Sequence, residues 1–359
     1  MTTALAPRLL AWFDQFGRKD LPWQRTDASG QRDAYRVWLS EVMLQQTQVS
    51  TVIGYFERFV NALPTLHDLA TADEDTVFAL WSGLGYYRRA RFLHQTAQLC
   101  VKQHGGELPR DFAALCALPG IGRSTAGAIL AQAHGLRFPI LDGNVKRVLT
   151  RYHGIAGYPG QSAIEKQLWH HAEAHTPPSR IADYTQAIMD LGATVCVRAR
   201  PHCEACPLAP DCVAYREQLT EQLPTRKPSK TVPTRSTVML VLRNQHGQIL
   251  LERRGPSGVW PGLWSLPEAS DSEAAARVAQ QYAKVAEVHP LTPFTHTFSH
   301  YHLAIEPLLF DHARSTPHVA DAPGLRWCSA AELATLGVPA PVRRLLLQIN
   351  DSTPSLTAK

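Results

Sequence analysis

The spacing of apolar residues divides the chain into two parts with different periods. Up to about residue 217, apolar side chains recur every three or four positions, as they do from Val37 to Phe59, and this period predicts helices. Glycine and proline interrupt the pattern at Gly83–Gly85, Pro119–Gly122 and Pro177–Pro178. The other helices predicted in this part cover 68–81, 88–103, 111–118, 124–134, 144–152, 162–174 and 181–192. We therefore expect a mainly α N-terminal domain over residues 1–217.

The second part begins after a short segment of different composition. Residues 218–235 contain three prolines that alternate with lysine and arginine, which predicts a semi-extended basic linker. Beyond it, Val238–Leu242 and Ile249–Leu251 flank a turn at Asn244–Gly247, as in a β-hairpin. Further elements are predicted as a helix at 272–287, strands at 302–310 and near 325–328, and a helix from 341. Residues 236–350 are thus expected to form a small α+β domain, followed by a tail at 351–359.

Composition and charge narrow the class of protein. The 359 residues are 45% hydrophobic and 19% charged, which is typical of globular domains. No run approaches the roughly 18 apolar residues of a membrane span, and the first residues lack the features of a signal peptide. We therefore expect a cytoplasmic protein with no membrane partner. The formal net charge of +5 is compatible with a nucleic-acid partner but does not by itself indicate one.

Four of the seven cysteines form a cluster in the sequence. Their pattern, C-x6-C-x2-C-x5-C, fits within 17 residues, so four thiolates can converge on one centre. Four thiolates suit either a cubane [4Fe–4S] cluster or zinc, although a zinc site favours two paired C-x2-C hooks and only one pair is present. The predicted metal ligands are Cys196, Cys203, Cys206 and Cys212.

A glycine turn and two carboxylates are the candidate chemistry of the helical part. Gly120 and Gly122 predict a tight turn before a new helix, whose free N–H groups can bind a DNA phosphate. Asp142 stands where a helix begins and can act as its N-cap, as a catalyst, or as both. Glu41 lies beside the apolar stripe of its helix, where an exposed glutamate is the ordinary interpretation. None of these features is specific when taken alone.

Taken together and in order, they resemble the helix-hairpin-helix DNA glycosylase superfamily with iron–sulfur clusters. The segments SEVMLQQTQV (40–49), GLGYY (83–87), LPGIGRSTAGAI (118–129) and LDGNVKRVL (141–149) resemble MutY-type adenine glycosylases in particular. The resemblance is dense over residues 8 to about 217 and looser beyond. It implies a helix-hairpin-helix domain with a [4Fe–4S] loop at 196–212, a Nudix-like C-terminal domain, and double-stranded DNA containing A:8-oxoguanine or A:G mispairs as the partner. It also implies a monomer that is cytoplasmic, in the bacterial cytosol or associated with the nucleoid.

The resemblance also implies the roles of the carboxylates. Glu41 matches the family's catalytic glutamate, which protonates adenine at N7, and Asp142 matches the aspartate that meets the positive charge left on the sugar. Asn144 matches a supporting polar residue beside that aspartate. Glu41 must hold a proton when substrate is bound, which requires burial to raise its pKa.

Other matched positions concern DNA and the reaction that follows base removal. Strand-cleaving relatives carry a lysine where this chain has Ser124, so a monofunctional enzyme that leaves an abasic site is expected. Predicted DNA contacts are Gln46, Thr47, Leu84, Tyr86, Gly120, Gly122, Ser124, Ser299 and His300, and the last two belong to the loop expected to read oxidised guanine. Predicted adenine-pocket residues are Trp23, Leu44, Gln186 and Asp190.

Three other functions remain open at this point. The chain could remove a different base, or it could be a DNA-binding module whose carboxylates are structural. It could also be a nucleotide pyrophosphatase that acts through the C-terminal domain. Residues 262–285 lack the glutamate-rich metal-binding helix of Nudix hydrolases, so we expect this domain to recognise and not to hydrolyse.

Overall fold

The computed structural model describes residues 5–228, 231–284, 287–298, 300–315, 322 and 324–351. Its contacts group into two compact units, one of Met1–Thr71 with Phe92–Ser229 and one of Ala72–Arg91 with Lys230–Lys359. The segment Ala72–Arg91 thus groups with the C-terminal part, although its helical pattern suggested the N-terminal domain. Within the described residues, no helix is both long and apolar enough to cross a bilayer.

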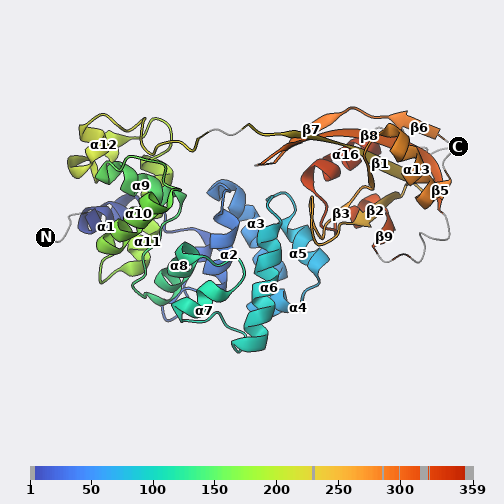
Figure 1. The fold of residues 1–359 in the computed structure, drawn as a ribbon. Helices are drawn as coiled ribbons and strands as arrows, with labels where there is room; N and C mark the ends of the chain where they lie inside the picture. The colour runs from blue at the N-terminus through green and yellow to red at the C-terminus, as the bar shows by residue number, and fades with distance from the viewer. Residues whose placement is uncertain are drawn as a thin grey trace. The chain divides into compact units, whose positions relative to one another are not determined.

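The first unit consists of helices (Figure 1). They are α1 (Leu5–Phe16), α2 (Ala34–Leu44), α3 (Val49–Ala62), α4 (Leu66–Thr71), most of α6 (Arg88–Gln103), α7 (Phe112–Ala117), α8 (Arg123–His134), α9 (Gly143–His153), α10 (Ser162–His175), α11 (Ile181–Asp190) and α12 (Val213–Arg216). Short 3-10 turns lie at Pro22–Gln24, Cys203–Ala205 and Ala209–Asp211, and a π-helical turn, η2 (Leu191–Val195), continues α11. From Glu217 to Pro228 the chain forms only turns and irregular structure.

Helix α8 is central to this unit because it packs against both α2 and α11. Its residues from Ala126 to Ala133 are buried without a break. The small side chains of this run allow the segment that contains Pro139 to approach the helix closely. A Cβ on Gly127 would lie 2.5 Å from the carbonyl oxygen of Pro139. A second apolar cluster joins α1, α9, α10 and α11.

The second unit is a mixed sheet with helices on both faces. The elements from the N-terminal part of the chain are α5 (Glu74–Trp81) and the GLGYY turn. The strands are β1 (Thr234–Asn244), β2 (Ile249–Arg253), β3 (Trp264–Ser265), β4 (Glu268–Ala269), β5 (Ala283–Lys284), β6 (Glu287–Pro290), β7 (Phe294–Thr297), β8 (His302–Ser315) and β9 (Leu325–Cys328), and the remaining helices are α13 (Ser272–Tyr282), α15 (Ala330–Leu333) and α16 (Ala340–Asp351).

Alternation along β1 explains the two cores of this unit. Val238, Leu240 and Leu242 face a cluster that includes α13, while Met239 and Val241 face one that includes α16. The sheet order is β3-β2-β1-β8-β5, and β1 pairs in parallel with β8 over most of its length. Figure 1 shows α13 and α16 with the sheet between them.

Several helices were predicted closely, and the differences have local causes. The continuous apolar stripe from Val37 to Phe59 belongs to two helices, α2 and α3. The helices are separate because Gln46, between them, adopts a φ of 59°, which a right-handed helix does not allow. The pattern over 68–81 is also two helices, since Asp73 caps α5 through the backbone N–H of Thr76. The helix predicted at 272–287 ends at Tyr282, where the chain enters β5. The β1–β2 hairpin is confirmed, with Asn244 Oδ1 accepting two backbone N–H bonds in its turn.

Candidate active site

Glu41 and Asp142 form an electrostatically coupled pair in the first unit. Glu41 lies on α2 and is half-buried, and its Oε1 accepts a 3.0 Å hydrogen bond from Nε2 of Gln132 on α8. Burial and, to a smaller extent, the negative charge of Asp142 raise the pKa of Glu41 to about 7, against the opposing effect of the Gln132 hydrogen bond. A carboxyl group with this pKa can hold a proton near neutral pH and donate it. The raised pKa that the proposed chemistry requires is therefore present.

Asp142 is the N-cap of α9, so the cap and the candidate catalyst are the same residue. Its Oδ1 accepts the backbone N–H of Val145 at 2.7 Å, and its Oδ2 accepts from Nδ2 of Asn144 at 3.3 Å. Burial raises the pKa of Asp142, while these hydrogen bonds and the Arg147 guanidinium act in the opposite direction. The cap fixes the rotamer of the carboxylate at the positive end of the helix dipole.

Gln132 was not predicted, and it determines how Glu41 is held. Its Oε1 accepts from Nη1 of Arg32 at 3.1 Å, so its amide nitrogen must face Glu41. A glutamine within the apolar run Ala126–Ala133 of α8 is the sequence signal that could have found it.

Arg147 and Gly192 also escaped prediction, and they hold Asn144 in place. The Arg147 guanidinium donates to Asn144 Oδ1 at 2.8 Å and to the backbone oxygens of Gly192 and Cys196 at 2.5 and 2.6 Å. A Cβ on Gly192 would lie 2.6 Å from Cβ of Asn144. Only glycine therefore lets η2 approach the start of α9 this closely.

The hairpin residues have distinct roles. Gly120 has a φ of 76°, and a Cβ there would lie 2.9 Å from Cβ of Phe92. Gly122, by contrast, has a φ of −89°, a backbone conformation that does not require glycine. Gly122 is the N-cap of α8 with no side-chain cap, and open space surrounds the position of a Cβ. This leaves the first N–H groups of α8 available to an anion.

Ser124 is engaged within the protein. Its Oγ accepts the backbone N–H of Leu141 at 2.9 Å, immediately before Asp142. Ser124 thus helps to place Asp142, the candidate catalytic residue.

Two residues predicted to enter DNA share an unusual backbone. Gln46 (φ 59°) and Tyr86 (φ 49°) are exposed non-glycine residues in the left-handed region, which costs about 1–3 kcal/mol and occurs at functional sites. Thr47 is half-buried, with Oγ1 3.5 Å from the backbone oxygen of Gln45. Leu84 is only 6% exposed, which argues against a direct DNA contact by its side chain.

Three of the predicted adenine-pocket residues have partners within the protein. Asp190 is 1% exposed and forms an ion pair with Arg18, while Gln186 donates to Asp190 Oδ1 at 2.8 Å. The polar atoms of Asp190 are therefore committed to a buried network that holds the segment around Arg18. Trp23 is buried edge-on against Phe56, and Leu44 is half-buried at the end of α2. Direct adenine contacts by these residues stay a prediction.

The four predicted metal ligands line one cavity, together with Val148, Leu191 and Leu208. Burial and, to a smaller extent, the three neighbouring thiols raise the pKa of Cys206 to about 12, so this thiol resists ionisation without a cation. Arg151 is 2% exposed and donates to Cys196 Sγ at 3.4 Å and to the backbone oxygens of Val197, Arg198 and Leu223. A buried guanidinium against these sulfurs suits a centre with net negative charge, so the residues fit a thiolate-bound metal group.

In the second unit, the loop expected to read oxidised guanine is a tight aromatic turn between β7 and β8. Phe298 N donates to the Tyr301 backbone oxygen at 2.9 Å, and the two rings stack 4.6 Å apart. His300 is exposed at the tip, whereas Ser299 lies outside the described residues. The nearby histidines have packing roles, since His296 contacts Trp260 and Phe298, and His302 bonds to Thr297.

The acids near α13 also have local partners. Asp271 is the N-cap of α13, and Glu268 pairs with Arg254. Glu273 is the only acidic residue within α13.

Comparison with known proteins defines the class. Residues 39–174 match the model described as HhH-GPD superfamily base excision DNA repair protein, and residues 238–348 match the NUDIX domain. Among solved structures, a thermostable thymine-DNA glycosylase is 27% identical with a TM-score of 0.54, and the match covers 60% of this chain and 96% of that one. The fold and the carboxylate pair therefore define a base excision repair protein of the helix-hairpin-helix superfamily, which confirms the predicted fold class.

Full-length relatives define the family. An adenine DNA glycosylase of Buchnera aphidicola subsp. Acyrthosiphon pisum (strain APS) is 36% identical over 339 residues, which are 94% of this chain and 95% of the relative. The adenine DNA glycosylase of Homo sapiens is 36% identical over 401 residues, covering 96% of this chain and 73% of the relative. The chain belongs to the adenine DNA glycosylase family, as its motifs indicated.

Proposed function

We propose that this protein hydrolyses the N-glycosidic bond of adenine mispaired with 8-oxoguanine or guanine and leaves an abasic site. The observation that carries the proposal is the coupled pair of Glu41 and Asp142, in which burial raises the pKa of Glu41 to about 7. Family membership supports adenine as the base removed. The mispair preference is our own inference from the sequence motifs.

The two carboxyl groups divide the reaction between them. Glu41 transfers its proton to N7 of adenine while the bond from C1′ to N9 breaks and its electron pair passes to the base. The carboxylate of Asp142 stabilises the positive charge left on the sugar. Water then adds at C1′ and its proton passes to a carboxylate, so the product is an abasic sugar and neutral adenine. Acid–base assistance of this kind is worth about 10²–10⁴-fold in rate.

The enzyme is proposed to stop at the abasic site. No lysine occupies position 124, and the hydroxyl of Ser124 is bonded to the backbone N–H of Leu141. An amine is needed to form a Schiff base with the abasic sugar. Borohydride should therefore trap no covalent complex between the wild-type protein and DNA.

Double-stranded DNA is the proposed partner of both units. Extrusion of a mispaired base costs roughly a few kcal/mol, and an exposed side chain such as Gln46 can occupy the gap. The uncapped start of α8 offers backbone N–H groups to a phosphate. In the second unit, the exposed His300 belongs to the turn proposed to contact oxidised guanine.

We also propose that Cys196, Cys203, Cys206 and Cys212 hold a [4Fe–4S] cluster. When bound, the cluster would cross-link the loop that follows η2 and, through Arg151, keep that loop against α9. Iron analysis tests this: Cys203→Ser should lose iron, while Cys116→Ser, outside the cavity, should keep four irons per chain. Full iron in Cys203→Ser would contradict the assignment.

Single-turnover base release tests the catalytic proposal. The wild type should release adenine from A:8-oxoguanine and A:G duplexes, but not thymine from G:T, and alkali should then cleave the strand. Glu41→Gln should keep DNA affinity and lose about 10²–10⁴-fold in rate. The matched control Glu57→Gln, at an exposed glutamate of α3, should retain the rate. Equal rates for wild type and Glu41→Gln would overturn the mechanism.

A further inference from the structure

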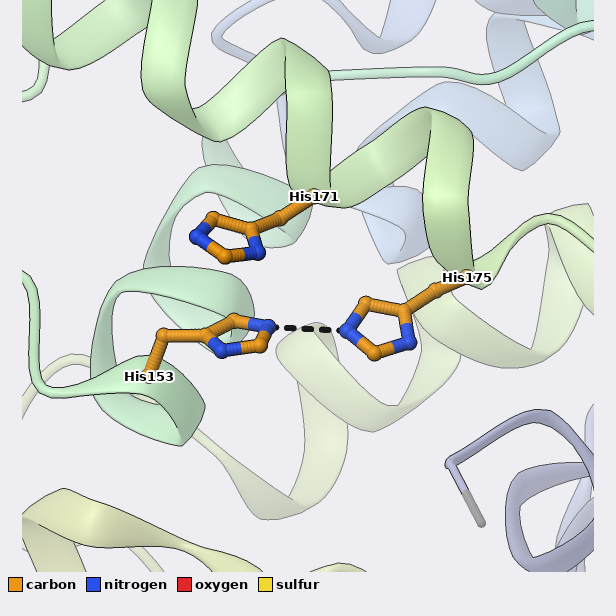
Figure 2. A group of neighbouring side chains, drawn as sticks. All are labelled: His153, His171 and His175. Atoms are coloured by element: carbon orange, nitrogen blue, oxygen red, sulfur yellow. Dashed lines mark hydrogen bonds between the residues drawn. The ribbon is translucent and has the colours of Figure 1, made fainter. Parts of the chain in front are cut away.

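Three histidines meet where α9 and α10 pack together, and none of them belongs to the sites described above. His153 is the last residue of α9, and His171 and His175 lie one helical turn apart on α10. Figure 2 shows the three imidazoles facing a common space. We call them the histidine trio.

The geometry of the trio is tight. Nε2 of His153 lies 2.8 Å from Nε2 of His175, and one ring nitrogen from each histidine lies within 4.8 Å of the other two. The rings of His153 and His171 stack with centroids 3.7 Å apart. Three imidazole nitrogens therefore converge on one small volume from two helices.

The surroundings favour the form of histidine that binds metals. His175 is 2% exposed, and the ring of Tyr152 packs edge-on against His153 and His175. Burial lowers the pKa of His153 to about 3 and that of His175 to about 4, so these imidazoles are neutral at physiological pH. His153 and His171 remain half-buried, so one side of the trio is open to solvent.

We propose that the histidine trio binds one divalent transition ion of the zinc class, with solvent as the fourth ligand. Zinc–nitrogen bonds of ~2.0–2.1 Å in a tetrahedral site separate ligand nitrogens by ~3.4 Å, which small rotations of these rings provide. Imidazole suits zinc, copper and nickel, whereas magnesium and calcium prefer oxygen ligands. The site is chemically distinct from the four-thiolate centre.

The bound ion would tie two helices together. His171 and His175 chelate from one face of α10, and His153 adds a ligand from α9, so the site exists only when the two helices are packed. An ion that binds the folded chain and not the unfolded one stabilises the fold by mass action. Binding should therefore appear as a shift in thermal unfolding as well as in metal content.

Zinc titration of the iron-loaded holoenzyme tests the proposal, because the cluster then occupies the thiolates. Calorimetry and elemental analysis should show one zinc per chain with unchanged iron, and the midpoint of thermal unfolding should rise by several degrees. His171→Ala and His153→Gln should each weaken zinc binding at least about tenfold and abolish the thermal shift.

His170→Ala is the matched control, since His170 is the exposed neighbour of His171 on the same helix and lies outside the trio. It should bind zinc like the wild type. Iron content and circular dichroism verify that the variants fold. Zinc binding that is equal in wild type and both trio variants, or absent from wild type with zinc in large excess, would overturn the proposal.

Discussion

Gln132 donates from its amide nitrogen to Oε1 of Glu41 at 3.0 Å, and its own oxygen accepts from Arg32 at 3.1 Å. The donor stabilises the charged form of Glu41 and so opposes the effect of burial on its pKa. The carboxyl group of Glu41 is thus held at a pKa near neutrality by opposing interactions.

Gln132→Leu should move the alkaline limit of activity to higher pH. The substitution removes the hydrogen bond that lowers the pKa of Glu41, so the group keeps its proton to a higher pH. The single-turnover rate of adenine release, measured from pH 6 to pH 9, checks this. Gln103→Leu, at an exposed position of α6, should leave the profile unchanged. A shift toward lower pH would show that Gln132 does not act on the charged form.

Glu41→Gln should stabilise the protein at alkaline pH. The folded-state pKa of Glu41 is raised from 4.5 to about 7, so the folded chain holds the proton more tightly than the unfolded chain does. The cost of ionising Glu41 in the folded state therefore grows as pH rises from about 4.5 to about 7 and is constant above that. At pH 8 the variant should gain ~1–3 kcal/mol in free energy of unfolding. Denaturant titrations of wild type and variant at pH 4 and pH 8 measure this. If the two proteins differed in free energy of unfolding by the same amount at both pH values, the raised pKa of Glu41 in the folded state would be contradicted.

Gly192→Ala should damage the site from a distance. A Cβ at this position lies 2.6 Å from Cβ of Asn144, so η2 and the start of α9 must separate. We expect a loss of ~1–3 kcal/mol in stability, together with slower base release. Gly54→Ala in α3 is the control, because nothing lies within 4 Å of its Cβ, and it should gain ~0.5–1 kcal/mol. If Gly192→Ala had the stability and the rate of the wild type, the close contact between η2 and the start of α9 would not be needed for either.

Ser124→Ala should slow catalysis without creating a lyase. It leaves the N–H of Leu141 without its acceptor beside Asp142, which should cost ~1 kcal/mol in stability. Base release should fall while DNA affinity stays near that of the wild type, because the changed bond positions the aspartate. Ser50→Ala, on the exposed part of α3, is the matched control. An unchanged rate in Ser124→Ala would show that Ser124 does not position Asp142 for catalysis.

The sequence by itself determined most of the helices, the β1–β2 hairpin and the spacing of the four cysteines. These features depend on contacts between near neighbours, such as the i and i+4 positions of a helix or the cap that Asp142 supplies to α9. The candidate acid and its partner could also be chosen, but only through their resemblance to a family, since Glu41 alone looks like a surface glutamate.

Only the tertiary structure decided the pKa values of those residues and their contacts with distant parts of the chain. The pKa of Glu41 depends on burial, on Asp142 and on Gln132, which lie about a hundred residues along the chain from it. The close approach of Gly192 to Asn144 and the meeting of His153 with His175 likewise join separate helices. The parallel pairing of β1 with β8 arises in the same way. Interactions between segments distant in sequence leave no periodic signal in either segment, so they appear only when the chain is packed.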